Sequence, residues 1–233
     1  MSETPVALIT GGGSGIGAAT ARGLLNLGYR VTVTGRGEAR LRGFAEELGS
    51  PPELLTIAGD AADYESVQAA VTASVEAFGC LDAVVANAGF ASFDDITDGD
   101  PALWRDMVLT NVLGPALLIR AALPALKETR GRIVLIGSVA GVVYSPGNIY
   151  GATKWAVTGM AENTRRLVTG DGVGVTLVNP GATETAFFDA GGGPPDRAMM
   201  TPEHIAGAII WALTQPPGVD VNTLTIRPSP SPL

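Results

Sequence analysis

Short apolar segments alternate with longer segments of helical periodicity along the chain. Runs rich in Val, Ile and Leu begin at residues 6, 30, 54, 81, 131, 173 and 222. Between them lie Ala-rich segments with apolar positions at helical spacing, at residues 18–27, 38–48, 65–78, 101–127, 150–168 and 202–213. Continuous apolar strands separated by helices are typical of parallel sheets that are covered on both faces. The pattern therefore predicts an α/β chain with a doubly wound fold of about seven strands.

No stretch of the chain resembles an interdomain linker, so we expect one domain over residues 1–233. The longest irregular segment covers residues 183–203 and is rich in glycine and proline. In a doubly wound fold, a loop that follows a late strand overhangs the carboxyl edge of the sheet, where ligands bind. We therefore expect residues 183–203 to form a lid over a ligand site.

Composition narrows the class of ligand and the compartment. The 233 residues are 46% apolar and carry a formal net charge of −8, and no run rich in Lys or Arg could displace counterions from a nucleic acid. We expect a small-molecule partner and no nucleic acid. The lone Cys80 excludes an intramolecular disulfide, and neither a basic leader nor an apolar run of bilayer length is apparent. The expected location is the cytoplasm, without a membrane segment and without a metal site.

A glycine-rich turn follows the first predicted strand, in the sequence "TGGGSGIG" at residues 10–17. Glycines in such a turn let the backbone approach a pyrophosphate, and the amides that begin the next helix can bind the anion. The strict GxGxxG spacing is absent, although its GxGxxA variant is present, and a simple tight turn is the alternative. The dinucleotide contacts expected here are Gly11, Ser14, Gly15, Ile16 and Gly17.

Tyr150 and Lys154 lie four residues apart in "IYGATKWAV", within a predicted helix. Residues at this spacing share one face of a helix, and a nearby ammonium group favours the phenolate. We therefore expect Lys154 to lower the pKa of Tyr150 and make it a usable acid or base. The alternative is a buried tyrosine beside a lysine whose stem packs on the core. The position of the pair, just after a strand that ends at Ser138, favours the first interpretation.

With the pattern TGxxxGxG at the first turn and YxxxK after Ser138, the chain resembles the short-chain dehydrogenases/reductases in their compact single-domain branch. The resemblance implies a Rossmann fold and an enzyme that interconverts a carbonyl and a secondary alcohol. It implies that Ser138 binds the substrate oxygen, that Tyr150 transfers the proton and that Lys154 holds the nicotinamide ribose. It also assigns Asn111, in "TNVLGP", to a proton relay through water. One departure is the separation of Ser138 and Tyr150 by 12 positions, one fewer than usual.

The resemblance also implies the remaining contacts to the cofactor. Arg36, just after the second strand, would pair with a 2′-phosphate and select NADP(H), whereas an acid there would select NAD. The alternative is that Arg36 is an exposed charged residue that binds no ligand. The other expected contacts are Asp60 at the adenine, Asn87, Ala88 and Gly89 under its ribose, and Pro180, Gly181, Thr183 and Thr185 near the nicotinamide. All of these residue types are also ordinary turn residues after strands.

Two alternatives to an NADP-dependent reductase remain open at this point. One is a dinucleotide-sensing regulatory protein that kept the fold and lost turnover. The other is an NAD-linked member of the family, such as an epimerase or dehydratase. Under the main hypothesis the substrate is a small carbonyl or alcohol of apolar or mixed polarity. The resemblance further implies a homotetramer or homodimer, paired through the helices at residues 101–127 and 150–168.

Overall fold

All strands of the computed structural model belong to one parallel sheet. The structure describes residues 4–191, 193 and 196–230. The strand order is β3-β2-β1-β4-β5-β6-β7, and each neighbouring pair is parallel. The strands are β1 (Val6–Thr10), β2 (Arg30–Gly35), β3 (Leu54–Ala58), β4 (Ala83–Ala86), β5 (Arg132–Ile136), β6 (Gly174–Pro180) and β7 (Thr223–Ile226). The predicted doubly wound α/β fold with seven strands is confirmed.

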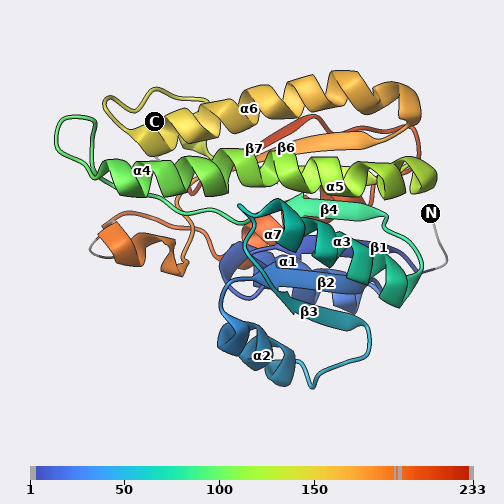
Figure 1. The fold of residues 1–233 in the computed structure, drawn as a ribbon. Coiled ribbons are helices and arrows are strands. Elements are labelled where there is room, and N and C mark those ends of the chain that lie inside the picture. Colours follow the sequence, from blue (N-terminus) through green and yellow to red (C-terminus); the bar gives the residue numbers. More distant parts are fainter. Residues whose placement is uncertain (1–3, 192, 194–195, 231–233) are drawn as a thin grey trace.

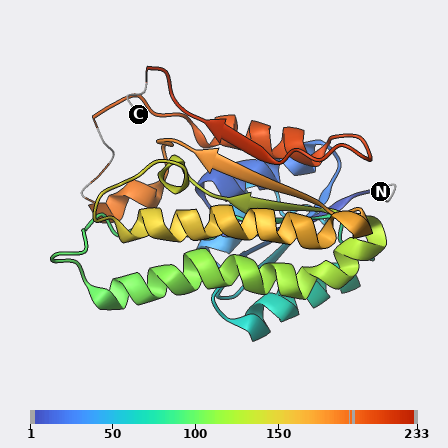
Figure 2. The same cartoon turned by 90° about the horizontal axis from the view of Figure 1, so that it is seen from above.

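Helices cover both faces of the sheet. They are α1 (Gly15–Asn26), α2 (Glu38–Glu47), α3 (Tyr64–Phe78), α4 (Pro101–Val108), α5 (Gly114–Thr129), α6 (Ile149–Val168) and α7 (Pro202–Leu213). Buried side chains of α3, α5 and α6 pack on one face, and those of α1, α2 and α7 pack on the other. Figures 1 and 2 show α5 and α6 running side by side, with the sheet between them and α7.

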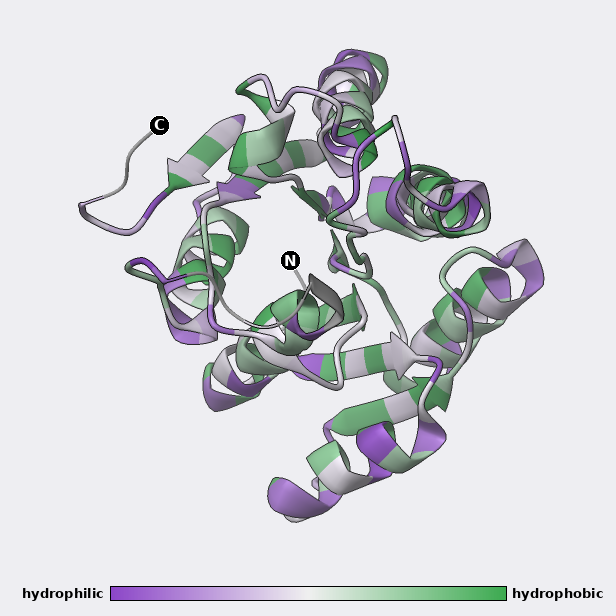
Figure 3. Ribbon diagram, turned by 90° about the vertical axis from the view of Figure 1, so that its left-hand side faces the viewer, coloured by the Kyte–Doolittle hydropathy of each residue, from purple (hydrophilic) through white to green (hydrophobic). Residues whose placement is uncertain are grey.

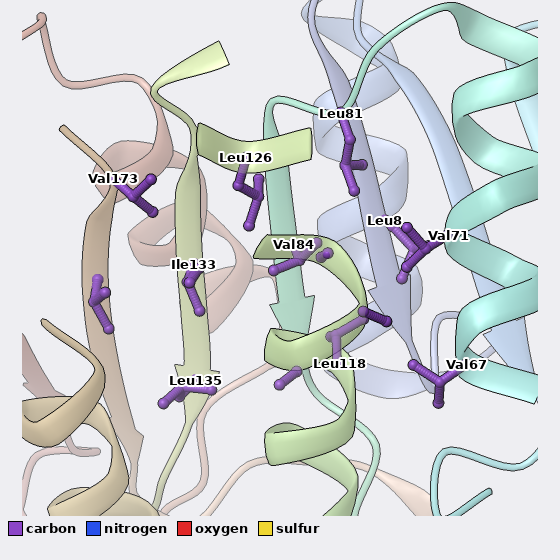
Figure 4. Close-up of a cluster of buried hydrophobic side chains, with 14 of the residues drawn as sticks. Leu8, Val67, Val71, Leu81, Val84, Leu118, Leu126, Ile133, Leu135 and Val173 are labelled. Carbon is purple, nitrogen blue, oxygen red and sulfur yellow. The ribbon is translucent and has the colours of Figure 1, made fainter. Parts of the chain in front are cut away.

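The core consists of two apolar clusters, one on each face of the sheet. Successive residues of a strand point to opposite faces, so Val6 and Leu8 join one cluster while Ala7 and Ile9 join the other. Figure 4 shows the first cluster. Leu8, Val84 and Ile133 of three strands face the helices, where Val67 and Val71 of α3 and Leu118 of α5 meet them. Burial on both faces explains why the central strands β1 and β4 are almost continuously apolar. Figure 3 shows green, apolar positions along the strands, separated in places by white or purple ones.

The direction of winding reverses between β1 and β4, which are neighbours at the centre of the sheet. From β1 the chain moves outward to β2 and β3, and from β4 it moves the other way to β5, β6 and β7. A crevice forms at the carboxyl ends of the strands at such a switch point. Most of the residues singled out in the sequence lie in turns after strands or at the start of α1, so the topology brings them to this one edge. Asn111, Tyr150 and Lys154 instead lie in helical segments.

The helix from Pro101 to Thr129 differs from the expectation that no apolar segment is long enough to cross a bilayer. It comprises α4, a π-helical turn at Leu109–Leu113 and α5, and its length and composition alone would suffice to cross a membrane. However, Leu118 and Leu126 are almost completely buried in the core beneath it. The core helices of α/β proteins can have the same length and composition, and one face of this helix belongs to the core.

Backbone hydrogen bonds join the two ends of the predicted lid segment. Met200 donates its N–H to the carbonyl oxygen of Ala182 at 2.9 Å, and Glu184 donates to the carbonyl oxygen of Met200 at 2.8 Å. Between these points lies a short 3-10 helix at Ala186–Gly191. Residues 192, 194 and 195 of the predicted lid lie outside the described residues, and its role as a lid stays a prediction.

Gly17 allows α1 to pack closely beneath the first turn. A Cβ atom at this position would lie 2.5 Å from the carbonyl oxygen of Gly11 and 2.6 Å from Nδ2 of Asn87. We expect Gly17→Ala to lower the free energy of unfolding by about 1–3 kcal/mol, because the backbone must shift to relieve this overlap. Urea denaturation followed by circular dichroism measures the change.

Gly43→Ala is the matched control for this substitution. Gly43 lies within α2, and nothing would lie within 4 Å of its added Cβ. Here the substitution should stabilise the protein by roughly 0.5–1 kcal/mol, through the higher helix propensity of alanine. Equal effects at the two positions would contradict the close packing inferred at Gly17.

Candidate active site

A cleft of about 680 Å³ opens at the carboxyl edge of the sheet, beside the switch point. Most of the residues predicted from the sequence line it: Gly11, Ser14, Gly15, Ile16, Arg36, Asp60, Asn87, Ala88, Gly89, Ser138, Tyr150, Lys154, Pro180, Gly181, Thr183 and Thr185. The two exceptions are Gly17 and Asn111, which are buried behind its wall. Segments far apart in the sequence thus converge on one cavity.

The first turn presents the amides that begin α1 and one hydroxyl to the cleft. Gly11 and Gly15 have φ values of 66° and 52°, a left-handed conformation that favours glycine. Ser14 is the N-cap residue of α1, but its side chain makes no capping hydrogen bond and is exposed in the cleft. The start of α1 therefore offers backbone N–H groups and a hydroxyl to an anion.

The Asn87 side chain joins two loops beneath the cleft, a role that the sequence did not indicate. Its Nδ2 donates to the carbonyl oxygens of Thr10 and Gly11, at 2.9 and 3.2 Å. The backbone N–H groups of Asn87 and Ala88 both donate to the Thr10 hydroxyl at 3.1 Å. These bonds fasten the turn after β4 to the turn after β1, so Asn87 both lines the cleft and supports its wall.

Most of the charged residues that line the cleft are cationic, although the protein as a whole is acidic. Besides Lys154, the lining includes Arg36, Arg40, Arg197 and Arg227, whereas Asp60 is the single acid. Among the described residues Arg36 forms no ion pair, because the nearby Glu38 is paired with Arg42 at 3.2 Å. Asp60 accepts a bond from the N–H of Ala62 at 2.9 Å. Such a cavity concentrates positive potential and favours an anionic ligand.

Three of these arginines were not expected to contribute to the site. Arg40 and Arg197 are both exposed, and both lie on the cleft wall. Arg227 follows β7 and had been overlooked, although it lies beside Gly181. An arginine directly after a strand was the available signal, the same one that identified Arg36.

Lys154 and Tyr150 project from α6 toward the end of β5. The Nζ atom of Lys154 donates to the carbonyl oxygen of Ile136 at 2.8 Å and lies 5.7 Å from the centre of the Tyr150 ring. The side chain of Ser138 accepts a bond from the N–H of Ala140 at 3.1 Å, and it lies close enough to the Tyr150 hydroxyl to lower the pKa of that phenol. Ser138, Tyr150 and Lys154 therefore meet at one point of the cleft.

The expectation that Lys154 lowers the pKa of Tyr150 was wrong for this state of the protein. Burial raises the pKa of Tyr150 to about 12, while its hydrogen bond with Ser138 acts in the opposite direction. Burial also lowers the pKa of Lys154 to about 8. Loss of hydration disfavours the charged form of both groups, and the amine is directed at the carbonyl oxygen of Ile136.

Asn111 lies in the π-helical turn between α4 and α5. It is 1% exposed, and its Oδ1 accepts from the N–H of Phe90 at 3.0 Å. Its Nδ2 donates to the carbonyl oxygen of Phe90 at 2.8 Å and to the Thr153 hydroxyl at 3.2 Å. Asn111 therefore connects the loop after β4 to α6, next to Lys154.

Aromatic side chains form the outer wall of the cleft, next to Tyr150. The ring centre of Phe187 lies 5.4 Å from that of Tyr150 and 5.7 Å from that of Phe93. Phe188 stacks on Phe93 at 5.8 Å. The other phenol of this region, Tyr144, is 91% exposed and stacks on Trp155 instead.

Stability should depend on pH through Lys154. A pKa lowered from 10.5 to about 8 means that the charged amine destabilises the folded state below pH 8 by roughly 3 kcal/mol. Between the two pKa values the unfolded chain binds more protons, so the stability of the wild type rises with pH. We expect Lys154→Met to be more stable than the wild type at pH 7, and this advantage to shrink toward pH 10.5. Urea denaturation at several pH values tests this, and an advantage independent of pH would contradict it.

Known proteins resemble this chain over nearly its full length. A family model described as short chain dehydrogenase matches residues 5–191. An uncharacterised oxidoreductase of Staphylococcus aureus (strain MW2) is 36% identical over 225 residues, which cover 96% of each chain.

Two solved structures share the fold. An alcohol dehydrogenase from the archaeon Thermococcus sibiricus, complexed with 5-hydroxy-NADP, has a TM-score of 0.90 at 30% identity and 99% coverage of both chains. ElxO with NADP bound has a TM-score of 0.87 at 26% identity, covering 96% of this chain and 97% of its own. With its parallel sheet, its glycine turn and the meeting of Ser138, Tyr150 and Lys154, the chain belongs to the short-chain dehydrogenase family of oxidoreductases.

Proposed function

We propose that the protein is an NADP(H)-dependent oxidoreductase that interconverts a carbonyl and a secondary alcohol. The observation that carries the proposal is the convergence of Ser138, Tyr150 and Lys154 in a cleft whose other half begins at the glycine turn. A hydroxyl and a phenol joined by a hydrogen bond can share one substrate oxygen, and the buried amine lies beside them. This arrangement suits proton transfer coupled to hydride transfer.

The cleft fits a phosphorylated dinucleotide. The amides at the start of α1 and the uncapped Ser14 hydroxyl would hold the pyrophosphate. Arg36 and Arg40 would hold a 2′-phosphate, and Asp60 with Asn87 to Gly89 would border the adenosine. Lys154 would hold the nicotinamide ribose, and Pro180, Gly181, Thr183 and Thr185 would border the nicotinamide. When bound, the cofactor supplies or accepts the hydride.

Tyr150 is the proton donor in the direction of reduction. With a pKa of about 12 it is protonated at neutral pH, so it can donate its proton to the developing alkoxide. Ser138 holds the same oxygen and stabilises its charge. Lys154 keeps the phenol in place from the next turn of α6, and Asn111 anchors the neighbouring loop where a relay of water would begin.

The substrate is a carbonyl compound with an apolar or mixed side group. Phe93, Phe187 and Phe188 line the part of the cleft outside Tyr150, and the segment 183–203 that carries two of them acts as the lid. An apolar group gains free energy by leaving water for such a wall. Arg197 and Arg227 at the rim would tolerate a polar or anionic end.

Cofactor choice depends on Arg36. We expect Arg36→Ala to weaken the binding of NADPH by about 1.5–3 kcal/mol and to leave NADH nearly unaffected, because a charge-assisted contact to the 2′-phosphate is lost. Calorimetric titration with both cofactors measures this. Arg166→Ala is the control, since Arg166 is an exposed arginine in the last turn of α6 and does not line the cleft. Tighter binding of NADH than of NADPH by the wild type would overturn the assignment.

Loss of the Tyr150 hydroxyl should abolish most of the turnover without unfolding the protein. Tyr150→Phe should keep NADPH binding and thermal stability, while kcat for carbonyl reduction falls by roughly 10²–10⁴-fold, the usual effect of losing a general acid. A panel of aromatic and aliphatic aldehydes and ketones, followed by NADPH absorbance, gives the rates. Tyr144→Phe, on the exposed phenol nearby, should change little. An active but destabilised Tyr150→Phe variant would refute the proposed mechanism.

We further propose that the protein acts in the cytoplasm as a homodimer or homotetramer. The outer faces of the helices from Pro101 to Thr129 and of α6 support pairing, since they expose the large apolar side chains of Leu103, Val108, Leu109, Leu113 and Trp155. Light scattering at micromolar concentration should report a dimer or tetramer. A stable monomer would contradict the proposal.

A further inference from the structure

We propose that Asn179, in β6, is a positioning residue that holds Ser138 in its catalytic orientation. The inference rests on the proposed function, since it assumes that the Ser138 hydroxyl binds the substrate oxygen. Asn179 is 0% exposed and does not line the cleft. Any effect of its side chain on catalysis must therefore pass through another residue.

The Asn179 side chain reaches across to the end of β5. Its Oδ1 accepts a hydrogen bond from the backbone N–H of Ser138 at 3.2 Å. The adjacent residue, Gly137, donates its N–H to the carbonyl oxygen of Val178 at 2.8 Å. A Cβ atom at Gly137 would lie only 2.2 Å from Oδ1 of Asn179, so the amide fits here because position 137 has no side chain.

The other end of the Asn179 amide is left without a partner. Its Nδ2 is buried and forms no hydrogen bond with any of the described residues. A flipped amide would not help, because Nδ2 would then face the N–H of Ser138, and both groups are donors. A buried donor without a partner destabilises a protein, and a leucine of similar size would remove this donor but would leave the N–H of Ser138 without its acceptor. The side chain is therefore poorly suited to stability and well suited to orienting Ser138.

The Ser138 hydroxyl depends on this anchor. Ser138 has an extended backbone, with φ −169° and ψ 159°, at the point where the chain leaves β5 for a 3-10 turn. Its Oγ accepts from the N–H of Ala140, and its own N–H is held by Asn179. Without the second bond the backbone of Ser138 could rotate and carry Oγ away from the Tyr150 hydroxyl. Small displacements of a catalytic group reduce turnover strongly.

The test compares Asn179→Leu, which removes the acceptor, with Asn179→Asp, which keeps an oxygen in its place. With NADPH and 4-nitrobenzaldehyde as probes, kcat should fall about tenfold in Asn179→Leu and by less in Asn179→Asp. NADPH affinity should stay unchanged in both, and the Tm of Asn179→Leu should change by no more than about 4 °C. Thr176→Val, a buried polar-to-apolar change in the same strand, is the control and should keep its turnover.

The decisive comparison uses Ser138→Ala as the background. If Asn179 acts through the Ser138 hydroxyl, adding Asn179→Leu to Ser138→Ala should lower kcat no further. A structural role would instead give a second loss of similar size, together with a lower Tm, and would overturn the inference. Wild-type turnover by Asn179→Leu would also overturn it.

Hydrogen exchange gives a readout that needs no substrate. The Ser138 amide should exchange slowly in the wild type and faster in Asn179→Leu, while the amides of β1 are unchanged. Equal exchange of the Ser138 amide in both proteins would overturn the inference. This test holds even if Asn179→Leu is too unstable for kinetic measurements. If Ser138→Ala and Tyr150→Phe both keep full turnover, or the wild type reduces no carbonyl, the proposed function itself fails. If only the Asn179 variants differ from the expected results, the inference fails but the proposed function is unaffected.

Discussion

The burial of the Lys154 amine against the end of β5 is the constraint on which the candidate active site depends. The side chain is 6% exposed, and its Nζ donates to the carbonyl oxygen of Ile136 at 2.8 Å. An amine in the interior needs such a partner, because an unpaired one would destabilise the fold by several kcal/mol, roughly the cost of an unsatisfied buried polar or charged group. The bond therefore fixes the position of α6 along β5. Tyr150, one turn earlier on α6, is fixed with it and meets Ser138.

Electrostatics then distinguishes this cavity from the rest of the molecule. The protein carries a net charge of −8, yet its cleft is lined by Lys154 and four arginines with Asp60 as the single acid in the lining. Most acidic side chains therefore lie outside the cleft, which concentrates positive potential and favours an anionic ligand. The same cavity is apolar where Phe93 and Phe187 meet Tyr150. An anion at one end and an apolar group at the other are thus the ligand features that it accommodates.

The sequence by itself determined the fold class and the membership of most of the cleft. Strand periodicity and helix periodicity are local properties, so the alternation of apolar strands with helices was sufficient for the doubly wound sheet. Parallel strands bring their carboxyl ends to one edge, which is why the glycine turn at Gly11 was expected to lie at a ligand site. Arg36 and Asn87 were assigned to the same site through the resemblance to the family, and both line the cleft. The shared face of Tyr150 and Lys154 likewise followed from helix geometry alone.

Only the tertiary structure decided the energies and cross-chain contacts within that site. The spacing of Tyr150 and Lys154 suggested a lowered phenol pKa, but burial raises it, because desolvation depends on everything that packs around a group. Arg227 enters the cleft through the neighbouring position of β7 and Gly181. Asn179 reaches Ser138 across adjacent strands that are distant in the sequence. No local pattern records such contacts, since they arise only when separate strands and helices are packed together.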